Sequence, residues 1–193
     1  MGMLVTNHVL SGALIGGAVR RPLPAFTLGV VSHFALDAVP HWGKFGSLPG
    51  GMLRVAVPDG LAGLAVIGTF AAIATPDRRL SVLAGMAGAA LPDIDKPSRL
   101  FFNRSPFPRA VDAFHSAIQD EAPDRAHYEL AAAAVLAVGA LAVLRRRSLA
   151  GQRLGQELSS AVPRALKSWS KWSRLCCSPR RLNVSWYVAT FAA

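Results

Sequence analysis

Five long apolar segments dominate the sequence and restrict its fold more than any other feature. They cover about residues 3–19, 24–40, 55–74, 79–92 and 126–144, separated by Arg pairs, prolines, glycines or polar loops. A helix needs roughly 20 apolar residues to cross a hydrocarbon core of about 30 Å. The third and fifth segments reach that length, the first two are near the lower limit, and the fourth needs a tilt or a place inside a bundle. The segments predict an all-α fold: a small polytopic bundle of membrane helices with four to five short spans.

The composition excludes several other classes of protein. The chain has 193 residues, of which 52% are hydrophobic and 17% are charged. Charged residues are too few to cover the surface of a water-soluble domain. The same low charge and high hydrophobicity exclude a disordered chain and a charge-rich nucleic-acid-binding domain. The two cysteines, Cys176 and Cys177, are adjacent and supply neither a disulfide framework nor a CxxC metal site. The class of protein that the composition leaves is a small integral membrane protein.

The positive charge belongs to the C-terminal third of the chain. Residues 1–129 carry 11 Lys and Arg against 10 Asp and Glu, whereas residues 130–193 carry 10 Lys and Arg against Glu157 alone. A neutral body with a basic tail fits anionic lipid headgroups better than a nucleic acid. We therefore expect a membrane-embedded helical domain at 1–144 with a polar insertion at about 93–125. The tail, 145–193, is expected either as an interfacial helix or as a poorly ordered basic segment.

The Lys and Arg residues of the loops also predict an orientation. With five spans, the side that holds the tail carries most of these residues, including the Arg145–Arg147 flank of the last span. The positive-inside rule then places the tail in the cytoplasm. The prediction is a multi-pass protein of the cell inner (plasma) membrane.

Ionisable residues at the ends of the apolar segments are the strongest functional signal. Such residues are costly in lipid and mark a functional interior. An up-and-down path of the segments brings one set to a single membrane face: His8, His41, Asp59, Asp93 and Asp95. Three of them directly follow a proline that is preceded by Ala and one apolar residue: His41, Asp59 and Asp93. Proline interrupts helix hydrogen bonding and can direct the next side chain away from lipid.

The spacing of His33 and Asp37 places both on one face of a helix. His41 lies one further turn along, or folds back over the pair if Pro40 breaks the helix. Imidazole and carboxylate groups together suit Zn²⁺ or Mn²⁺. The metal ligands predicted are His8, His33, Asp37, His41 and Asp93. A plain hydrogen-bonded His33–Asp37 pair is the alternative.

These residues together resemble the inner-membrane-bound, metal-dependent hydrolases of the YdjM type. The likeness covers roughly residues 5–130 and depends on Asn7-His8 followed by Gly12, on Ser32-His33-x-x-Leu36-Asp37, and on Leu91-Pro92-Asp93-Ile94-Asp95. The run from His33 to His41 is also similar to the metal motif of zinc-dependent phospholipase C enzymes, with a shorter final spacing. The resemblance implies ligands at His8, His33, Asp37, Asp93 and Asp95. In the YdjM-type pattern the Pro-Asp-x-Asp element precedes the Ser-His-x-x-x-Asp element, whereas in this chain it follows. Of the family's His-Arg-Gly-x-Thr-His-Ser element, Phe114-His115-Ser116 is at most a remnant.

Metal-assisted hydrolysis is the chemistry that these ligands support. Asp95 or Asp59 would take the proton of the attacking water, and Lys96 and Arg99 would contact a phosphate. The substrate expected is a phosphoester at the extracytoplasmic headgroup level, which makes membrane lipid the expected partner. The alternatives are an ion-relay or transport protein and a structural protein whose metal holds helices together. His115, on a predicted amphipathic helix over Arg109–Glu121, is interpreted as a surface histidine.

Overall fold

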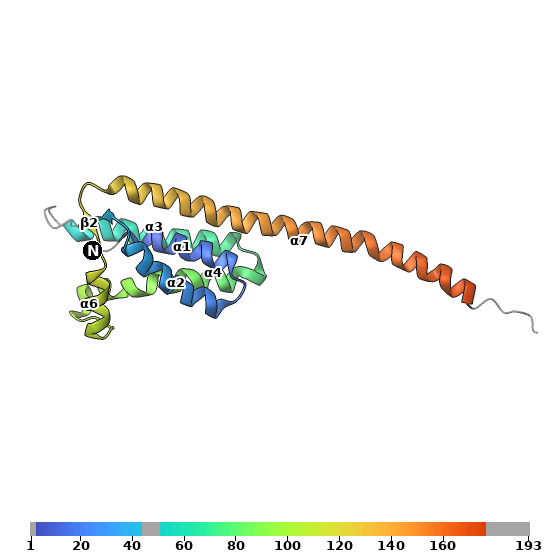
Figure 1. Cartoon of the computed structure of the whole chain (residues 1–193), viewed down its shortest axis with the longest axis horizontal. Helices are drawn as coiled ribbons and strands as arrows, with labels where there is room; N and C mark the ends of the chain where they lie inside the picture. Colours follow the sequence, from blue (N-terminus) through green and yellow to red (C-terminus); the bar gives the residue numbers. More distant parts are fainter. Residues whose placement is uncertain (1–2, 44–50, 177–193) are drawn as a thin grey trace, which may run out of the picture. The chain divides into compact units, whose positions relative to one another are not determined.

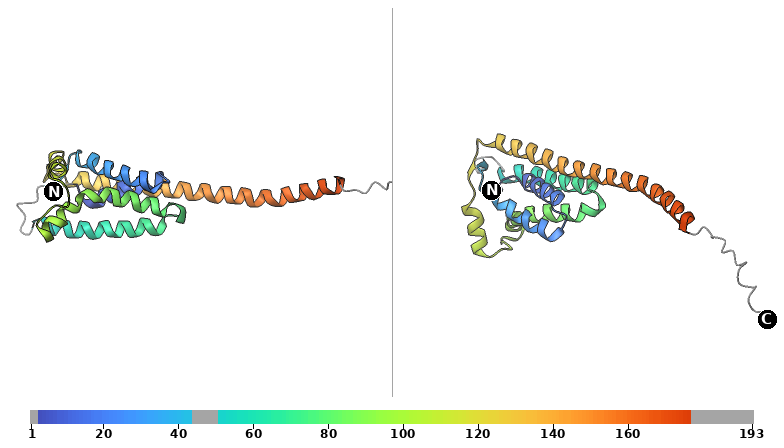
Figure 2. Two further views of the ribbon diagram at one scale, coloured as in Figure 1. Left: turned by 90° about the horizontal axis from the view of Figure 1, so that it is seen from below. Right: turned by 45° about the vertical axis from the view of Figure 1, so that its right-hand side comes forward.

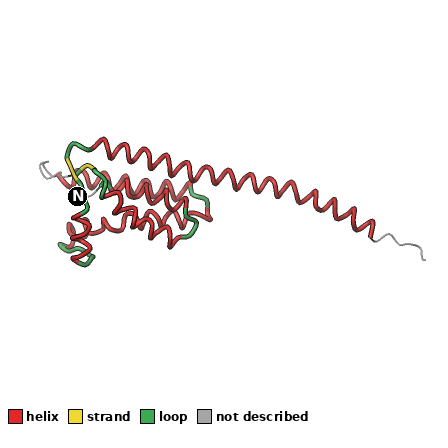
Figure 3. Tube along the Cα trace, viewed as in Figure 1, coloured by secondary structure: helices red, strands yellow, loops and turns green. Residues whose placement is uncertain are grey.

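A computed structural model describes residues 3–43 and 51–176 of the chain. The elements follow the order α1 (Val5–Ala18), α2 (Pro22–Asp37), β1 (His41–Trp42), α3 (Gly51–Ile73), α4 (Pro76–Ala90), η2 (Leu91–Ile94), α5 (Asp95–Phe102), α6 (Arg109–Ala117), β2 (Glu121–Ala122) and α7 (Ala126–Cys176). The predicted all-α class is confirmed, since strands in the described residues contribute only a two-residue parallel pairing (Figure 3). The chain forms two units, Met1–Ser148 and Leu149–Ala193, and the first contains the candidate site.

Helices α1, α2 and α4 pack closely because glycines line their contacts. A Cβ at Gly85 of α4 would collide with the carbonyl oxygen of Gly12 in α1, and a Cβ at Gly88 would collide with that of Phe26 in α2. Small residues at such positions let helix backbones approach one another, as membrane helices often do. The two views of Figure 2 show α1 to α4 lying side by side.

The apolar core joins these helices to α3 and to the first part of α7. Its buried members include Val9 and Ala13 of α1, Phe70 of α3, Met86 of α4 and Ala140 of α7. Proline at the first turn begins both α2 and α4, where its fixed φ fits and its missing N–H costs nothing.

Two helices among the described residues are long and apolar enough to cross a membrane, Leu53–Ile73 within α3 and Ala126–Arg146 within α7. This number is below the four to five spans predicted from the sequence. Helices α1, α2 and α4 have only 14, 16 and 15 residues. At about 1.5 Å per residue they are shorter than a hydrocarbon core of about 30 Å.

Two element boundaries differ from the predictions. Pro58, expected near the beginning of a span, lies inside α3, which already begins at Gly51. Helix α7 does not end near residue 144 but continues through Arg145–Arg147 to Cys176. Arg, Leu, Gln and Ala are strong helix formers, so a basic flank that would stop membrane insertion does not stop the helix.

The polar insertion folds over one end of the bundle. The 3₁₀ turn η2 continues α4 directly into α5, and Asn103, in the left-handed conformation at φ 55°, ends α5. Helix α6 follows and ends at Ala117, earlier than predicted. Figure 1 shows α6 and β2 at the end of the bundle where α1 begins. This end brings together the beginning of α1, the end of α2 and the end of α4.

Candidate metal centre

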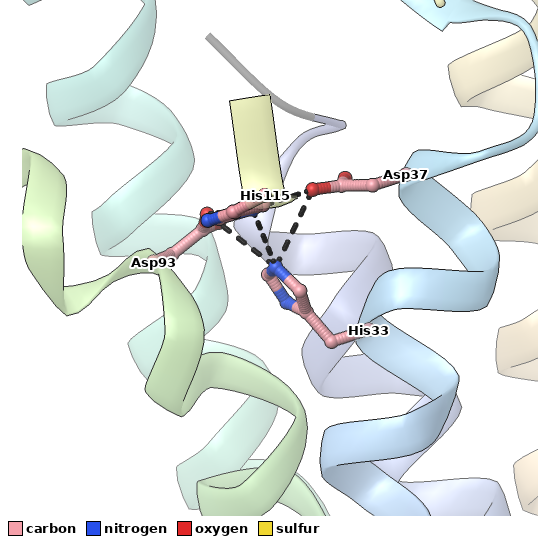
Figure 4. Close-up of side chains that lie close together, drawn as sticks. All are labelled: His33, Asp37, Asp93 and His115. Carbon is pink, nitrogen blue, oxygen red and sulfur yellow. Dashed lines mark hydrogen bonds and ion pairs between the residues drawn. The ribbon is translucent and has the colours of Figure 1, made fainter. Parts of the chain in front are cut away.

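Four buried side chains from three elements converge at this end of the bundle (Figure 4). His33 and Asp37 come from the last turn of α2, Asp93 from η2, and His115 from α6. One ligand atom of each lies within 4.8 Å of all the others. These four residues, here called the His–Asp cluster, could hold a metal ion.

The distances within the His–Asp cluster match those between ligands of one cation. His33 Nε2 lies 3.0 Å from His115 Nε2, 3.4 Å from Asp37 Oδ2 and 3.7 Å from Asp93 Oδ1. His115 Nε2 lies 2.8 Å from Asp37 Oδ2 and 3.9 Å from Asp93 Oδ1. Tetrahedral bonds of about 2.0–2.1 Å would place neighbouring ligand atoms roughly 3.3 Å apart. The two imidazoles and two carboxylates therefore fit a single small divalent cation.

The backbone fixes the His33 ring with its lone pair toward the cluster. His33 Nδ1 lies 2.7 Å from the carbonyl oxygen of Ala89. A carbonyl only accepts, so Nδ1 carries the proton and Nε2 of the neutral ring is left as an electron-pair donor. A second hydrogen bond of this kind orients metal-ligating histidines in many proteins.

The cluster concentrates negative charge in a buried space. Two carboxylates and the His33 lone pair converge on His115, whose Nε2 can donate at most one proton. Lys96 contributes one positive charge through its ion pair with Asp93 Oδ1. With the imidazoles neutral, as metal ligation requires, two carboxylates against one ammonium leave the group net negative, which burial makes costly without a compensating cation.

The Asp93–Lys96 pair holds both partners in their charged forms. Burial by itself raises the pKa of the Asp93 carboxyl, but the Lys96 ammonium lowers it, and the net pKa lies below the usual value. Burial lowers the pKa of the Lys96 ammonium, whereas Asp93 raises it, and the net pKa lies above the usual value. Asp93 is therefore ionised and available as a ligand at neutral pH.

His8 lies directly behind the cluster. Its ring stacks on that of His33 with centroids 3.9 Å apart, and its Nε2 lies 3.2 Å from Asp37 Oδ1. Neither ring nitrogen of His8 has a hydrogen-bond partner among the described residues, although the side chain is fully buried. Met3 N–H also donates to Asp37 Oδ1, at 3.2 Å. His8 thus lies close to Asp37 Oδ1, whereas His33 and His115 contact Oδ2 of the same carboxylate.

The structure places His41 and Asp59 outside the His–Asp cluster. His41 donates from Nδ1 to the Val39 carbonyl, and its Nε2 faces Glu121 Oε1 at 3.9 Å. Asp59 caps α1 from α3: its Oδ2 accepts from Val5 N–H at 2.7 Å, and its Oδ1 accepts from Thr6 N–H at 3.1 Å. Both carboxylate oxygens of Asp59 are thereby used to satisfy the first turn of α1.

Asp95, Lys96 and Arg99 instead line a polar pocket beside the cluster. The pocket has a volume of about 350 Å³, and His115 forms part of its wall. Arg99 is held by Asp112 at 2.6 Å and by Asp95 Oδ2 at 3.5 Å. Asp95 Oδ1 is buried and has no hydrogen-bond partner among the described residues. The structure thus brings these three residues to one cavity next to the candidate ligands.

Two buried polar residues at this end of the bundle were not predicted from the sequence. His115, interpreted as a surface histidine, is buried in the cluster, and its only sequence signal is the short Phe114-His115-Ser116 remnant. Glu129, also buried, accepts from the Asn7 side chain at 2.5 Å, from Leu4 N–H at 3.4 Å and from Trp42 N–H at 3.3 Å. Glu129 connects α7 to the beginning of α1 and to β1. The sequence alone, one acidic residue near the start of a helix, does not predict these contacts.

No family model, curated protein or solved structure matches the chain. The function is therefore inferred from the geometry of the His–Asp cluster and of the polar pocket beside it.

Proposed function

We propose that the chain is a membrane-embedded, metal-dependent hydrolase of a phosphoester, acting at the extracytoplasmic face. The observation that carries the proposal is that the His–Asp cluster forms part of the wall of the polar pocket through His115. A buried cation site beside a cavity with both acidic and basic groups is the arrangement that hydrolysis requires.

His33, Asp37, Asp93 and His115 would hold the cation, and the mixed nitrogen and oxygen donor set favours Zn²⁺ or Mn²⁺. A divalent cation held there would activate water and offset negative charge on phosphoryl oxygens. His8, predicted from the sequence as a ligand, lies outside the four-residue set and would orient Asp37 from behind.

The pocket residues have separate tasks. Asp95 Oδ1, which has no partner among the described residues, would accept the proton of the attacking water. Arg99, held in place by Asp112, and Lys96 would bind the phosphoryl oxygens. Asp59 is not part of this scheme, because both of its oxygens cap α1.

The membrane orientation follows from α7. Its beginning lies beside β2 at the site end of the bundle, and the candidate span Ala126–Arg146 ends within the run Arg145–Arg147 at the other end. The positive-inside rule puts this basic flank and the tail in the cytoplasm, which leaves the cluster extracytoplasmic. The shorter helices α1, α2 and α4 would complete a multi-pass bundle by tilting or by thinning the bilayer locally.

The burial of the cluster favours a second candidate, a metal that only holds the helices together. His33, Asp37 and His115 are all buried, and the ligands join α2, η2 and α6. An ion relay is less well supported, because the buried acidic and imidazole groups of the described residues gather at one end of the bundle. A structural site needs no proton acceptor, so Asp95 separates the two candidates.

Detergent-purified protein loaded with Zn²⁺ or Mn²⁺ tests the proposal with a chromogenic phosphodiester. We expect hydrolysis by the wild type, loss of hydrolysis in His33→Ala, and a loss of about 10²-fold or more in Asp95→Asn with the metal retained. His127→Ala, at an exposed histidine, is the control and keeps full activity. A wild type that binds metal but hydrolyses no phosphoester would support the structural role and contradict the enzyme.

A further inference from the structure

An apolar groove runs between the beginning of α1, helix α3 and helix α5. One part has a volume of about 300 Å³, and an adjoining part of about 670 Å³ shares several of its walls. Val57 and Gly60 of α3 and Pro97 and Phe101 of α5 line both parts. These volumes lie in the range of small-molecule sites.

The groove ends at the candidate metal centre. Asp93, one of the four cluster residues, and Lys96, its ion-pair partner, line the same 300 Å³ cavity. Lys96 also lines the polar pocket together with Asp95, Arg99 and His115. The Lys96 side chain therefore lines both the apolar cavity and the polar pocket.

We propose that the apolar groove binds the acyl chain of a membrane lipid whose phosphate group occupies the polar pocket. This inference rests on the proposed hydrolase function and names its substrate class. A lipid phosphoester is the molecule that offers an apolar chain and an anionic phosphate in adjacent positions, as the two cavities do. Lys96 and Arg99 complement the charge of the phosphate.

In a bilayer, the walls of the groove would face the hydrocarbon from which a bound chain comes. Val57 and Leu61 of α3 are 53% and 63% exposed, and both lie in one of the two helices long enough to cross a membrane. Phe101 of α5 is 73% exposed beside the same groove. A lipid can therefore enter sideways from the bilayer without leaving it.

Gly60 allows the groove to be filled without disturbing the fold. A Cβ at Gly60 would meet no atom within 4 Å, because this position opens on the groove. A Cβ at Gly68, eight residues further along α3, would also meet nothing within 4 Å, and Gly68 lines none of the cavities described above. Phe at either position also replaces a poor helix former. Gly60→Phe and Gly68→Phe are thus a matched test and control.

The first experiment measures phosphate release from long-chain and short-chain phosphatidic acid in identical mixed micelles. We expect the ratio of kcat/KM for the long chain to that for the short chain to fall about tenfold in Gly60→Phe, since several methylene groups lose their contacts. The ratio stays at the wild-type value in Gly68→Phe. An unchanged ratio in Gly60→Phe, or an equal fall in both variants, would overturn the proposal.

The second experiment measures binding without hydrolysis, so that the two proposals can fail separately. Phosphatidic acid with a photoactivatable acyl chain is cross-linked to the metal-loaded protein in vesicles, and the labelled peptides are identified by mass spectrometry. We expect label on α3 and α5, suppressed in Gly60→Phe and retained in Gly68→Phe. Label on a protein that hydrolyses neither phosphatidic acid nor the chromogenic phosphodiester would support the groove and contradict the hydrolase. Equal labelling by a photoactivatable diacylglycerol, which lacks the phosphate, would show a groove filled by bulk lipid and would overturn the inference.

Discussion

The Nε2 atoms of His33 and His115 lie 3.0 Å apart, although 82 residues separate them in the chain. The Ala89 carbonyl holds the proton of His33 on Nδ1, so this approach aims a lone pair at a second imidazole. Two carboxylates complete the same buried space. A proton on His115 satisfies one of these acceptors, whereas a divalent cation satisfies all four groups.

His115→Ala removes one of the four predicted ligands. We expect the affinity for Zn²⁺ or Mn²⁺ to fall about 100-fold or more, since loss of residues that merely orient a ligand already costs up to about that much. Metal titration of the purified apoprotein measures the change, with the exposed His127→Ala as control. Equal affinities of the two variants would remove His115 from the site.

Three of the four cluster residues could be predicted from the sequence, because their positions depend on local helix spacing and on where the apolar segments end. His33 and Asp37 lie one helical turn apart, and that spacing alone places them on one face. Asp93 follows the proline that ends an apolar segment, so the alternation of segments brings it to the same end. The structure brings His33, Asp37 and Asp93 together as ligand atoms within 4.8 Å. Their roles as ligands stay predictions until a metal is measured.

The two aspartates proposed from the sequence as proton acceptors are expected to behave differently. Asp59→Ala leaves Val5 and Thr6 N–H groups without their cap and is expected to cost about 1–2 kcal/mol of unfolding free energy, with the metal retained. Asp95→Asn keeps the size of the side chain and is expected to reduce hydrolysis with little effect on stability. Thermal unfolding and phosphoester hydrolysis, measured on both variants, separate the roles. Greater loss of stability in Asp95→Asn than in Asp59→Ala would contradict this assignment.

The packing of α4 against α1 depends on the absence of a side chain at Gly85. Gly85→Ala places a methyl group against the Gly12 carbonyl and is expected to destabilise the fold by about 1–3 kcal/mol. Gly68→Ala adds a methyl group in open space and is expected to be neutral or stabilising by up to about 1 kcal/mol. Circular dichroism during thermal unfolding in detergent measures both. A Gly85→Ala variant as stable as Gly68→Ala would contradict the close contact.

The β1–β2 pairing is expected to depend on pH through His41 and Glu121. Burial lowers the pKa of the His41 imidazole, but Glu121 raises it, and the net pKa lies above the usual 6.5. Burial raises the pKa of the Glu121 carboxyl, but His41 lowers it, and the net pKa lies below the usual 4.5. The Glu121 contribution is complete above pH 4.5 and is lost as the pH falls through its lowered pKa. The His41 contribution is complete below pH 6.5 and is lost as the pH rises through its raised pKa.

The pair therefore stabilises the fold most between these two values. We expect Glu121→Gln to lower the Tm of the metal-free protein at about pH 5.5 and to lower it less at about pH 8. Thermal unfolding in a chelating buffer makes the measurement without interference from metal loss. A loss of Tm that is the same at both pH values would contradict an ion pair between the two residues.

The features that the sequence did not predict depend on long-range packing. His115 lies on a short helix after a proline-rich insertion, and periodicity within that helix cannot show which element it packs against. The burial of Glu129 likewise arises from contacts with Asn7 and Trp42, more than 80 residues away. The continuation of α7 past Arg145–Arg147 has a different cause, because charge governs membrane insertion and not helix formation.

X-ray absorption spectroscopy of the zinc-loaded protein tests the central claim most directly, because it reports the atoms bound to the metal. The account predicts one zinc ion per chain with two imidazole ligands and oxygen ligands at about 2.0–2.1 Å. His33→Ala and His115→Ala would each remove one imidazole from the spectrum. Protein that binds no zinc, or zinc whose spectrum lacks imidazole scattering, would contradict the account.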